Sequence, residues 1–207
     1  MLESIPVTIY SGPTLRLALN PSREKQLRDF NLTAVQVAEV LALLIDLPDE
    51  ANEVIEAPFA NKRFLPGQTR FSDGSPVFYS ALELETVEKE VAHWYRLGSA
   101  FPLPMYRRVA NVEFSGDVKD LRPMTSVWPF LIADKPYDEC NKLGTEAIAA
   151  KLAGLLSQSA RQPTGTTLPV FNRNALSGTE LRDWRVFTYN PATDEVLVTP
   201  IFAVPKI

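Results

Sequence analysis

The sequence contains one cysteine, Cys140, and one histidine, His93, in 207 residues. A single cysteine excludes an internal disulfide and a cysteine-clustered zinc site. A single histidine excludes the multi-histidine zinc hydrolases, so we predict no metal site. A Ser-His-Asp triad would have to include His93. We interpret Cys140 as a half-buried helix residue and His93 as a structural histidine whose hydrogen bonds are satisfied.

Long apolar runs are also missing from this chain. The longest one lies around residues 40–45, far short of the roughly 20 residues that a membrane-spanning helix needs. The first twelve residues, MLESIPVTIYSG, lack the pattern of a secretory signal peptide. With neither a signal nor a disulfide, the expected compartment is the cytoplasm, and we expect no association with a membrane.

The chain has no excess of positive charge. Its 21 Lys and Arg residues stand against 25 Asp and Glu residues, which gives a net charge of −4. Such a balance does not favour direct binding to nucleic acid. The motifs G-x-G-x-x-G and G-x-x-x-x-G-K-[ST] are absent as well, so we do not expect a doubly wound nucleotide-binding fold.

The patterning predicts a single α+β domain over residues 1–207. The seventeen prolines and nine glycines are spread along the chain, with no linker long enough to separate two domains. Helical spacing of apolar residues predicts helices over 31–47, 86–97 and 143–156. Short strands are predicted at 77–79, 109–114, 168–171, 186–189 and 196–198. The last two are expected to form a hairpin.

The helix predicted over 86–97 carries an acidic residue on its apolar face. The apolar face is defined by Val87, Val91 and Trp94. Glu90 lies within this stripe, whereas Glu88 and Lys89 are expected on the solvated side. A carboxylate on a core-facing stripe is costly unless it is paired or borders a cleft. Glu90 is therefore a functional carboxylate, part of a buried structural ion pair, or a residue at an edge of the stripe that reaches water.

Two arginines on a nearby loop are candidate partners for this carboxylate. Arg63 and Arg70 stand in a segment bent by proline and glycine, just before the strand that carries Tyr79. Arginine in such a loop is suited to bidentate binding of phosphate or carboxylate. Further along, the predicted helix 143–156 ends in a polar loop with Ser157 and Ser159, and spacing does not favour one serine over the other as a ligand contact.

Four motifs occur in order along the chain. They are Gly67-x-x-Arg70-Phe71, Val77-Phe78-Tyr79-Ser80-Ala81, Glu85-Thr86-x-x-x-Glu90-Val91 and Gly154-x-x-x-x-Ser159-x-Arg161. Together they resemble the RES domain, a family named for its arginine, glutamate and serine, over about residues 63–176. By this resemblance we expect Arg70, Glu90 and Ser159 to be catalytic. Arg63 matches the family's earlier arginine less closely, because that arginine often stands further upstream.

The resemblance implies a fold similar to that of ADP-ribosyltransferase toxins, with small mixed or antiparallel sheets and flanking helices around an NAD+ cleft. It also implies a toxin of a bacterial toxin–antitoxin pair that cleaves the nicotinamide–ribose bond of NAD+ by phosphorolysis or hydrolysis. NAD+ would be the substrate, inorganic phosphate a co-substrate of phosphorolysis, and no cofactor is implied. The implied partners are a DNA-binding antitoxin that blocks the cleft and further copies of the toxin in a homo-oligomer.

The residue types suit this chemistry. The transition state resembles an oxocarbenium ion, and nicotinamide leaves from a cationic pyridinium, so no general acid is needed and one carboxylate suffices. We expect Glu90 to hold the ribose hydroxyls and to stabilise the developing positive charge. Arg70, together with Arg63, would neutralise the diphosphate, and Tyr79 would stack on nicotinamide or ribose.

Two further residues are assigned to the acceptor side of the reaction. Ser159 is expected to position the nicotinamide ribose or the incoming phosphate, and Arg161 to face that phosphate. Two alternatives remain open: a mono-ADP-ribosyltransferase that modifies a cellular protein, and a catalytically silent binding module with the same fold. A hydrolase that uses His93 or Cys140 is not supported, because neither residue stands in a nucleophile-elbow motif.

Overall fold

The computed structural model describes residues 1–18, 51–60, 69–98 and 104–201. In these residues seven strands form one sheet, in the order β1-β2-β5-β4-β3-β6-β7. Their bounds are β1 Val7–Ala18, β2 Phe78–Ala81, β3 Met105–Asp120, β4 Gly154–Gln158, β5 Thr166–Val170, β6 Leu176–Asn190 and β7 Glu195–Ile201. The helix predicted over 31–47 lies outside the described residues, and so does Arg63.

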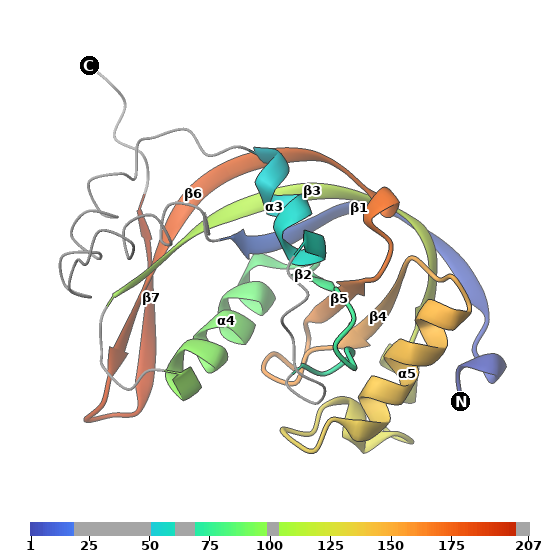
Figure 1. The fold of residues 1–207 in the computed structure, drawn as a ribbon. Coiled ribbons are helices and arrows are strands. Elements are labelled where there is room, and N and C mark those ends of the chain that lie inside the picture. Colours follow the sequence, from blue (N-terminus) through green and yellow to red (C-terminus); the bar gives the residue numbers. More distant parts are fainter. Residues whose placement is uncertain (19–50, 61–68, 99–103, 202–207) are drawn as a thin grey trace.

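The sheet closes on itself, because β1 pairs with β3 as well as with β2. Five strands thus form a closed sheet, and β6 and β7 extend it from β3 (Figure 1). Only β3 and β4 run parallel among the pairings of the described strands, so the sheet is mixed. The predicted α+β class and C-terminal hairpin are confirmed.

The expectation of separate small sheets is wrong, because all seven described strands belong to one sheet. The sequence patterns did not predict β1, which pairs with β3 in an unbroken antiparallel ladder from Val7↔Lys119 to Ala18↔Arg108 and so closes this sheet. Its sequence, VTIYSGPTLRLA, is mostly solvent-accessible in its first half and contains glycine and proline. Such a segment lacks the regular apolar alternation by which a strand is detected in sequence.

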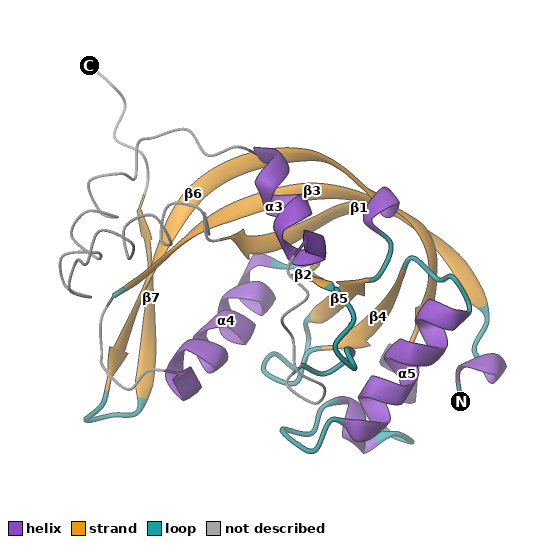
Figure 2. Ribbon diagram, viewed as in Figure 1, coloured by secondary structure: helices purple, strands orange, loops and turns teal. Residues whose placement is uncertain are grey.

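Three described helices lie against this sheet (Figure 2): α3 Ala51–Ala60, α4 Leu84–Gly98 and α5 Asp138–Ala149. Helix α4 contacts β1 and β7, whereas α3 contacts β6. The prediction for α4 is confirmed with ends extended by one or two residues. In Figure 1, α4 and α5 lie below the arch made by the long strands β1, β3 and β6.

The helix predicted over 143–156 is wrong in its second half. Helix α5 ends at Ala149, Lys151 takes a positive φ of 57°, and residues 154–158 form β4. The first four residues of β4 are all buried, because this strand lies between β3 and β5. A short apolar run that is buried on both faces has the same sequence pattern in a central strand as in a buried helix.

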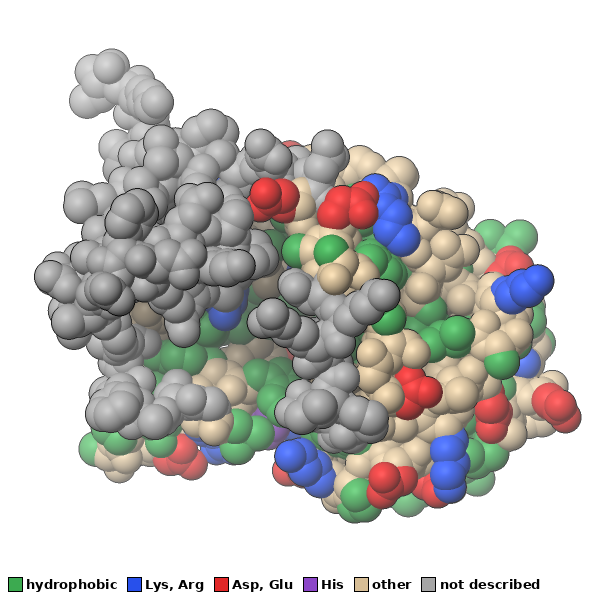
Figure 3. Space-filling model, in the orientation of Figure 1, with side chains coloured by type: hydrophobic (Ala, Val, Ile, Leu, Met, Phe, Trp, Pro, Cys, Tyr) green, Lys and Arg blue, Asp and Glu red, His purple; other side chains and the backbone are tan. Residues whose placement is uncertain are grey.

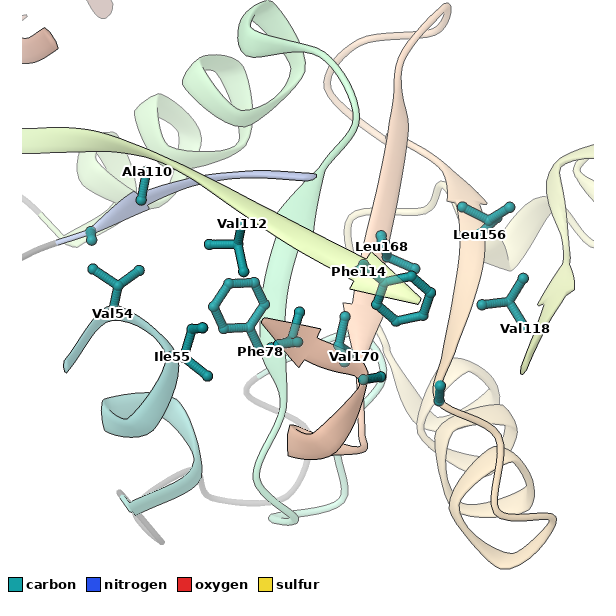
Figure 4. Packing of buried hydrophobic residues seen from close by; sticks show 14 residues of the cluster. Val54, Ile55, Phe78, Ala110, Val112, Phe114, Val118, Leu156, Leu168 and Val170 are labelled. Carbon is teal, nitrogen blue, oxygen red and sulfur yellow. The ribbon is translucent and has the colours of Figure 1, made fainter. Parts of the chain in front are cut away.

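The interior of the closed sheet is apolar (Figure 4). Side chains from β2, β3 and β5 meet there with two from α3: Phe78, Val112, Phe114, Leu168, Val170, Val54 and Ile55. At roughly 25 cal/mol per Å² of apolar surface removed from water, these clustered aromatic and aliphatic side chains supply much of the stability of the domain. Packing in this core fixes the positions of β2 and β5, and with them the positions of the residues at the ends of these strands.

One face of α5 holds the chain segment that contains Arg70. The Nδ2 atom of Asn141 donates to the carbonyl oxygens of Thr69, at 2.7 Å, and of Arg70, at 2.9 Å. Gly144, one turn later, has no side chain, and a Cβ there would overlap the carbonyl oxygen of Phe71. The helix therefore packs directly on the backbone beside Arg70.

Charges of both signs are interspersed on one face of the molecule. On the face in Figure 3, Lys and Arg side chains alternate with Asp and Glu side chains over the coloured part of the molecule. None of the helices described here is long and apolar enough to cross a membrane.

We predict that Gly144→Ala destabilises the protein by about 1–3 kcal/mol, because the backbone of Phe71 must move to admit a methyl group. Urea unfolding followed by circular dichroism measures this change. Lys142→Ala on the same helix removes only an exposed ion pair with Glu139 and should stay within about 0.5 kcal/mol of the wild type. Equal midpoints for the two variants would contradict the close approach.

Candidate active site

A cavity of about 220 Å³ lies beside α4 and the ends of β1, β2 and β4. Its lining is mostly apolar, with a few charged and aromatic groups, as in typical small-molecule sites. Its charged and aromatic lining residues include Arg16, Arg70, Tyr79, Glu90, Trp94, Tyr137 and Arg161. The fold thus brings four of the predicted site residues, Arg70, Tyr79, Glu90 and Arg161, to one cavity from four separate segments.

The carboxylate of Glu90 is bound by the hydroxyl of Ser159. Ser159 Oγ donates to Glu90 Oε1 at 2.6 Å, across 69 residues of sequence. Of the two serines considered in the sequence, Ser159 is thus the one that meets Glu90, whereas the hydroxyl of Ser157 contacts the carbonyl oxygen of Gln158. Within the described residues, the hydroxyl of Ser159 is thus a hydrogen-bond partner of Glu90. The Glu90 side chain also lines the cavity.

Ser159 itself is almost fully buried, with 2% of its surface exposed. Its Oγ accepts hydrogen bonds from the backbone N–H groups of Arg161, at 3.1 Å, and Gln162, at 3.0 Å. A hydroxyl group has one donor and two acceptor lone pairs. Because the donor goes to Glu90 and both lone pairs to backbone N–H groups, protein partners use the whole hydrogen-bonding capacity of Ser159.

Further contacts hold the loop after β4 against α4. Lys89 Nζ donates to Gln162 Oε1 at 2.7 Å, and Gly165 lies so close to Thr86 that any Cβ would overlap its hydroxyl. The loop contacts therefore follow one side of α4 over two turns. Glu90 and Ser159 meet where this loop packs against α4, so the geometry of their hydrogen bond depends on both the helix and the loop.

Arg161 is held from two sides. Its Nη1 atom forms an ion pair with Asp134, and its Nη2 atom lies 2.9 Å from His93 Nε2. Burial, and then the charge of Arg161, lowers the pKa of His93, so the neutral imidazole is favoured and its Nε2 accepts from Arg161. His93 thus has a polar partner, as a structural histidine should, and that partner lines the cavity.

Arg70 is bound to the backbone of a neighbouring loop. Its Nη1 atom donates to the carbonyl oxygens of Leu131, at 2.9 Å, and Ala133, at 2.8 Å. Its guanidinium also lies over the ring of Tyr137, 4.9 Å from the centroid. These contacts orient Arg70 at the cavity and order residues 131–137 at the same time.

Tyr79 presents its ring to the cavity, while its hydroxyl group is used elsewhere. The Tyr79 oxygen accepts from the backbone N–H of Phe71 at 3.0 Å. Burial raises the pKa of Tyr79 to about 12, so the phenol is neutral at physiological pH. The ring is available for apolar contact, and the hydroxyl fixes the segment that carries Arg70.

One charged cavity residue has no counterpart among the predicted site residues. Arg16, on β1, donates from Nη1 to the carbonyl oxygen of Tyr79 at 2.8 Å and lies over the ring of Phe78. Burial lowers its pKa to about 10, which still leaves the guanidinium charged at neutral pH. Arg16 belongs to no motif, and the strand around it alternates only locally, so the sequence gives no signal for a site residue here. Its place in the cavity depends on the pairing of β1 with β2 and β3.

Two expectations on side chains need correction. Glu88 is not on the solvated face of α4, because it forms an ion pair with the buried Arg185 of β6, Nε to Oε1, at 2.5 Å. Cys140 lies in a helix, as expected, but is fully buried, and burial raises its pKa to about 11. Its protonated thiol is a structural group and a poor nucleophile.

Comparisons with known proteins identify the family of this chain. A protein-family model described as the RES domain matches residues 43–188, which includes Arg70, Tyr79, Glu90 and Ser159. No curated protein sequence matches the chain. The model covers well over half of the 207 residues. The chain therefore belongs to the RES domain family, a toxin family of toxin–antitoxin systems.

Proposed function

We propose that this protein is the toxin of a bacterial toxin–antitoxin pair and that it degrades NAD+ by cleaving the nicotinamide–ribose bond. The observation that carries the proposal is the Glu90 carboxylate, which is held in the cavity wall by Ser159 while three arginines line the same cavity. One fixed carboxylate and several guanidinium groups match a substrate that develops positive charge at the ribose and carries two phosphates. Family membership supports an enzyme-like toxin.

The proposed reaction breaks the bond between ribose C1′ and the nicotinamide nitrogen. The electron pair of that bond leaves with nicotinamide, which becomes neutral, and the oxygen of the acceptor bonds to C1′. Water as acceptor gives ADP-ribose and releases a proton, whereas phosphate gives ADP-ribose-1″-phosphate. Glu90 stabilises the positive charge that develops on the ribose while the bond breaks. A fixed carboxylate does this effectively where little water screens its charge.

The hydrogen-bond pattern suggests a revised role for Ser159. Because its hydroxyl is fully used by Glu90 and two backbone N–H groups, we assign it to positioning Glu90 rather than to binding ribose or phosphate. It also fixes the start of the loop that carries Arg161. Ser159 is thus a positioning residue in our proposal.

Three arginines share the binding of anionic groups in the proposed complex. Arg16 and Arg161 come from β1 and the loop after β4, and Arg70 from the segment before β2. Each guanidinium is oriented by protein contacts before the ligand arrives, which lowers the entropy cost of binding. Tyr79 provides an aromatic surface for nicotinamide or ribose.

The family also supplies the proposed protein partners. We propose that a DNA-binding antitoxin covers the cavity and that the toxin forms a homo-oligomer. Trp94 lines the cavity and is 41% exposed, and Leu97, one turn further along α4, is 57% exposed. Large apolar side chains exposed beside a cavity are typical of a protein interface.

The decisive experiment incubates purified protein with NAD+, with and without inorganic phosphate, and identifies the products by mass spectrometry. We predict nicotinamide release by the wild type and a loss on the order of 100-fold or more in Glu90→Gln, which keeps the shape but removes the charge. ADP-ribose-1″-phosphate only with phosphate identifies a phosphorylase, and ADP-ribose in both samples identifies a hydrolase.

The matched control is Glu85→Gln, on the exposed side of the same helix, where Glu85 pairs with Lys89 in solvent. It should keep the wild-type rate. Intact NAD+ in every sample would refute NAD+ degradation. In that case, label transfer from NAD+ to protein would point to an ADP-ribosyltransferase, and no transfer to a silent binding module.

We expect Ser159→Ala to lower kcat about 10- to 100-fold with little change in KM, because Glu90 loses the group that orients it. Ser157→Ala, two residues earlier on β4, serves as the control and should leave kcat near the wild-type value. Ser159→Thr, which keeps the hydroxyl, should restore part of the rate. An unchanged kcat in Ser159→Ala would exclude the positioning role.

Arg16→Lys tests the arginine that the sequence patterns did not reveal. Lysine keeps the charge but loses the planar fork, so we expect KM for NAD+ to rise about tenfold. Steady-state kinetics measures this, with Arg182→Lys, an exposed residue of β6, as the control. A KM equal to that of the control would remove Arg16 from the proposed binding site.

A further inference from the structure

The guanidinium of Arg161 is paired with a carboxylate of the protein itself. Asp134 Oδ1 accepts from Arg161 Nη1. The two side chains differ strongly in burial, since 12% of Arg161 and 76% of Asp134 is exposed. A largely buried guanidinium that lines a cavity is thus neutralised by a carboxylate that stands mostly in water.

Asp134 faces several basic groups at once. Arg161, foremost, and then His93 and Arg70 hold the pKa of the Asp134 carboxyl below its usual value. The loop that carries Asp134 is held by Arg70, which donates to the carbonyl oxygens of Leu131 and Ala133. The fold therefore places one negative charge near the guanidinium groups of Arg161 and Arg70 and the imidazole of His93.

The contacts of Arg161 leave one of its donors unused. Nη1 binds Asp134 and Nη2 contacts His93, whereas Nε is buried and has no hydrogen-bond partner among the described residues. An unsatisfied buried donor is costly. A ligand with more acceptor oxygens than one carboxylate would satisfy this guanidinium better than Asp134 does.

Asp134 can leave Arg161 at little cost to itself, because its carboxylate is already mostly in water. The largely buried guanidinium of Arg161 then needs another anion in its place. A phosphate dianion carries more charge than a carboxylate and offers three or more acceptor oxygens. It can therefore displace Asp134 into solvent and pair with the buried charge of Arg161 in its place.

We propose that inorganic phosphate binds to the guanidinium of Arg161 and that the carboxylate of Asp134 competes with it for this group. The charge of Asp134 then sets how strongly the protein binds phosphate. Only the consequence of this inference rests on the proposed NAD+ cleavage. If the protein cleaves NAD+, the side chain of Asp134 determines the ratio of phosphorolysis to hydrolysis. The binding of phosphate itself needs no NAD+ and is tested without it.

The test is isothermal titration calorimetry, which measures the dissociation constant of inorganic phosphate for the purified full-length protein and its variants at constant ionic strength. Asp134→Asn keeps the size of the side chain and removes the competing charge, so we expect phosphate to bind about tenfold more tightly than to the wild type. Asp138→Asn, the same substitution on an exposed residue of α5, is the matched control and should match the wild type. Arg161→Gln should bind phosphate at least tenfold more weakly than the wild type.

Adenosine monophosphate, titrated into the same proteins, distinguishes the free acceptor from a phosphate of the substrate. We expect the gain in Asp134→Asn with inorganic phosphate, and a smaller one with the nucleotide. Equal phosphate affinity in Asp134→Asn and Asp138→Asn would overturn the proposal, and so would a gain with the nucleotide alone. Matching melting temperatures of these two variants ensure that the comparison reports on binding even if Arg161→Gln does not fold.

A second readout links this site to the reaction. With NAD+ and a fixed phosphate concentration, Asp134→Asn should raise the ratio of ADP-ribose-1″-phosphate to ADP-ribose several-fold over Asp138→Asn. An unchanged ratio despite tighter phosphate binding would overturn the acceptor role. If NAD+ stays intact in all proteins while Asp134→Asn binds phosphate more tightly, the proposed function fails and the phosphate site stands.

Discussion

The hydrogen bond from Ser159 Oγ to Glu90 Oε1 joins the two halves of the candidate site. Glu90 comes from α4, which packs against β1 and β7, and Ser159 comes from the loop after β4. The bond holds a carboxylate at the cavity wall and uses the only hydroxyl proton that the serine has. Both the direction of Glu90 and the path of the loop toward Arg161 depend on it.

The arginines of the cavity follow a common principle. Arg16 and Arg70 each donate to backbone carbonyl oxygens, and Arg161 is held by His93 and Asp134. Such contacts satisfy buried guanidinium groups that would otherwise be too costly to place beside an apolar core. They also fix each charge before a ligand arrives, so a site built in this way combines fold stability with readiness to bind anions.

Much of the site could be predicted from order and spacing along the chain. Glu90 stands out because it interrupts the apolar stripe of its helix, and the motifs around Arg70, Tyr79 and Ser159 resemble one family in the right order. The prediction failed where local patterns are ambiguous: a run buried on both faces made β4 look like part of a helix. Arg16 was missed because its strand has neither regular alternation nor a motif.

The sequence by itself determined the α+β class, the helix with Glu90, the hairpin at the end and the residues that the family shares. Only the tertiary structure decided that β1 closes the sheet onto β3, which brings Arg16 into the cavity, and that Ser159 rather than Ser157 meets Glu90. It also decided that Asp134 faces Arg161. These pairings join residues at least 27 positions apart, and such contacts arise from packing of whole elements, which no local pattern encodes.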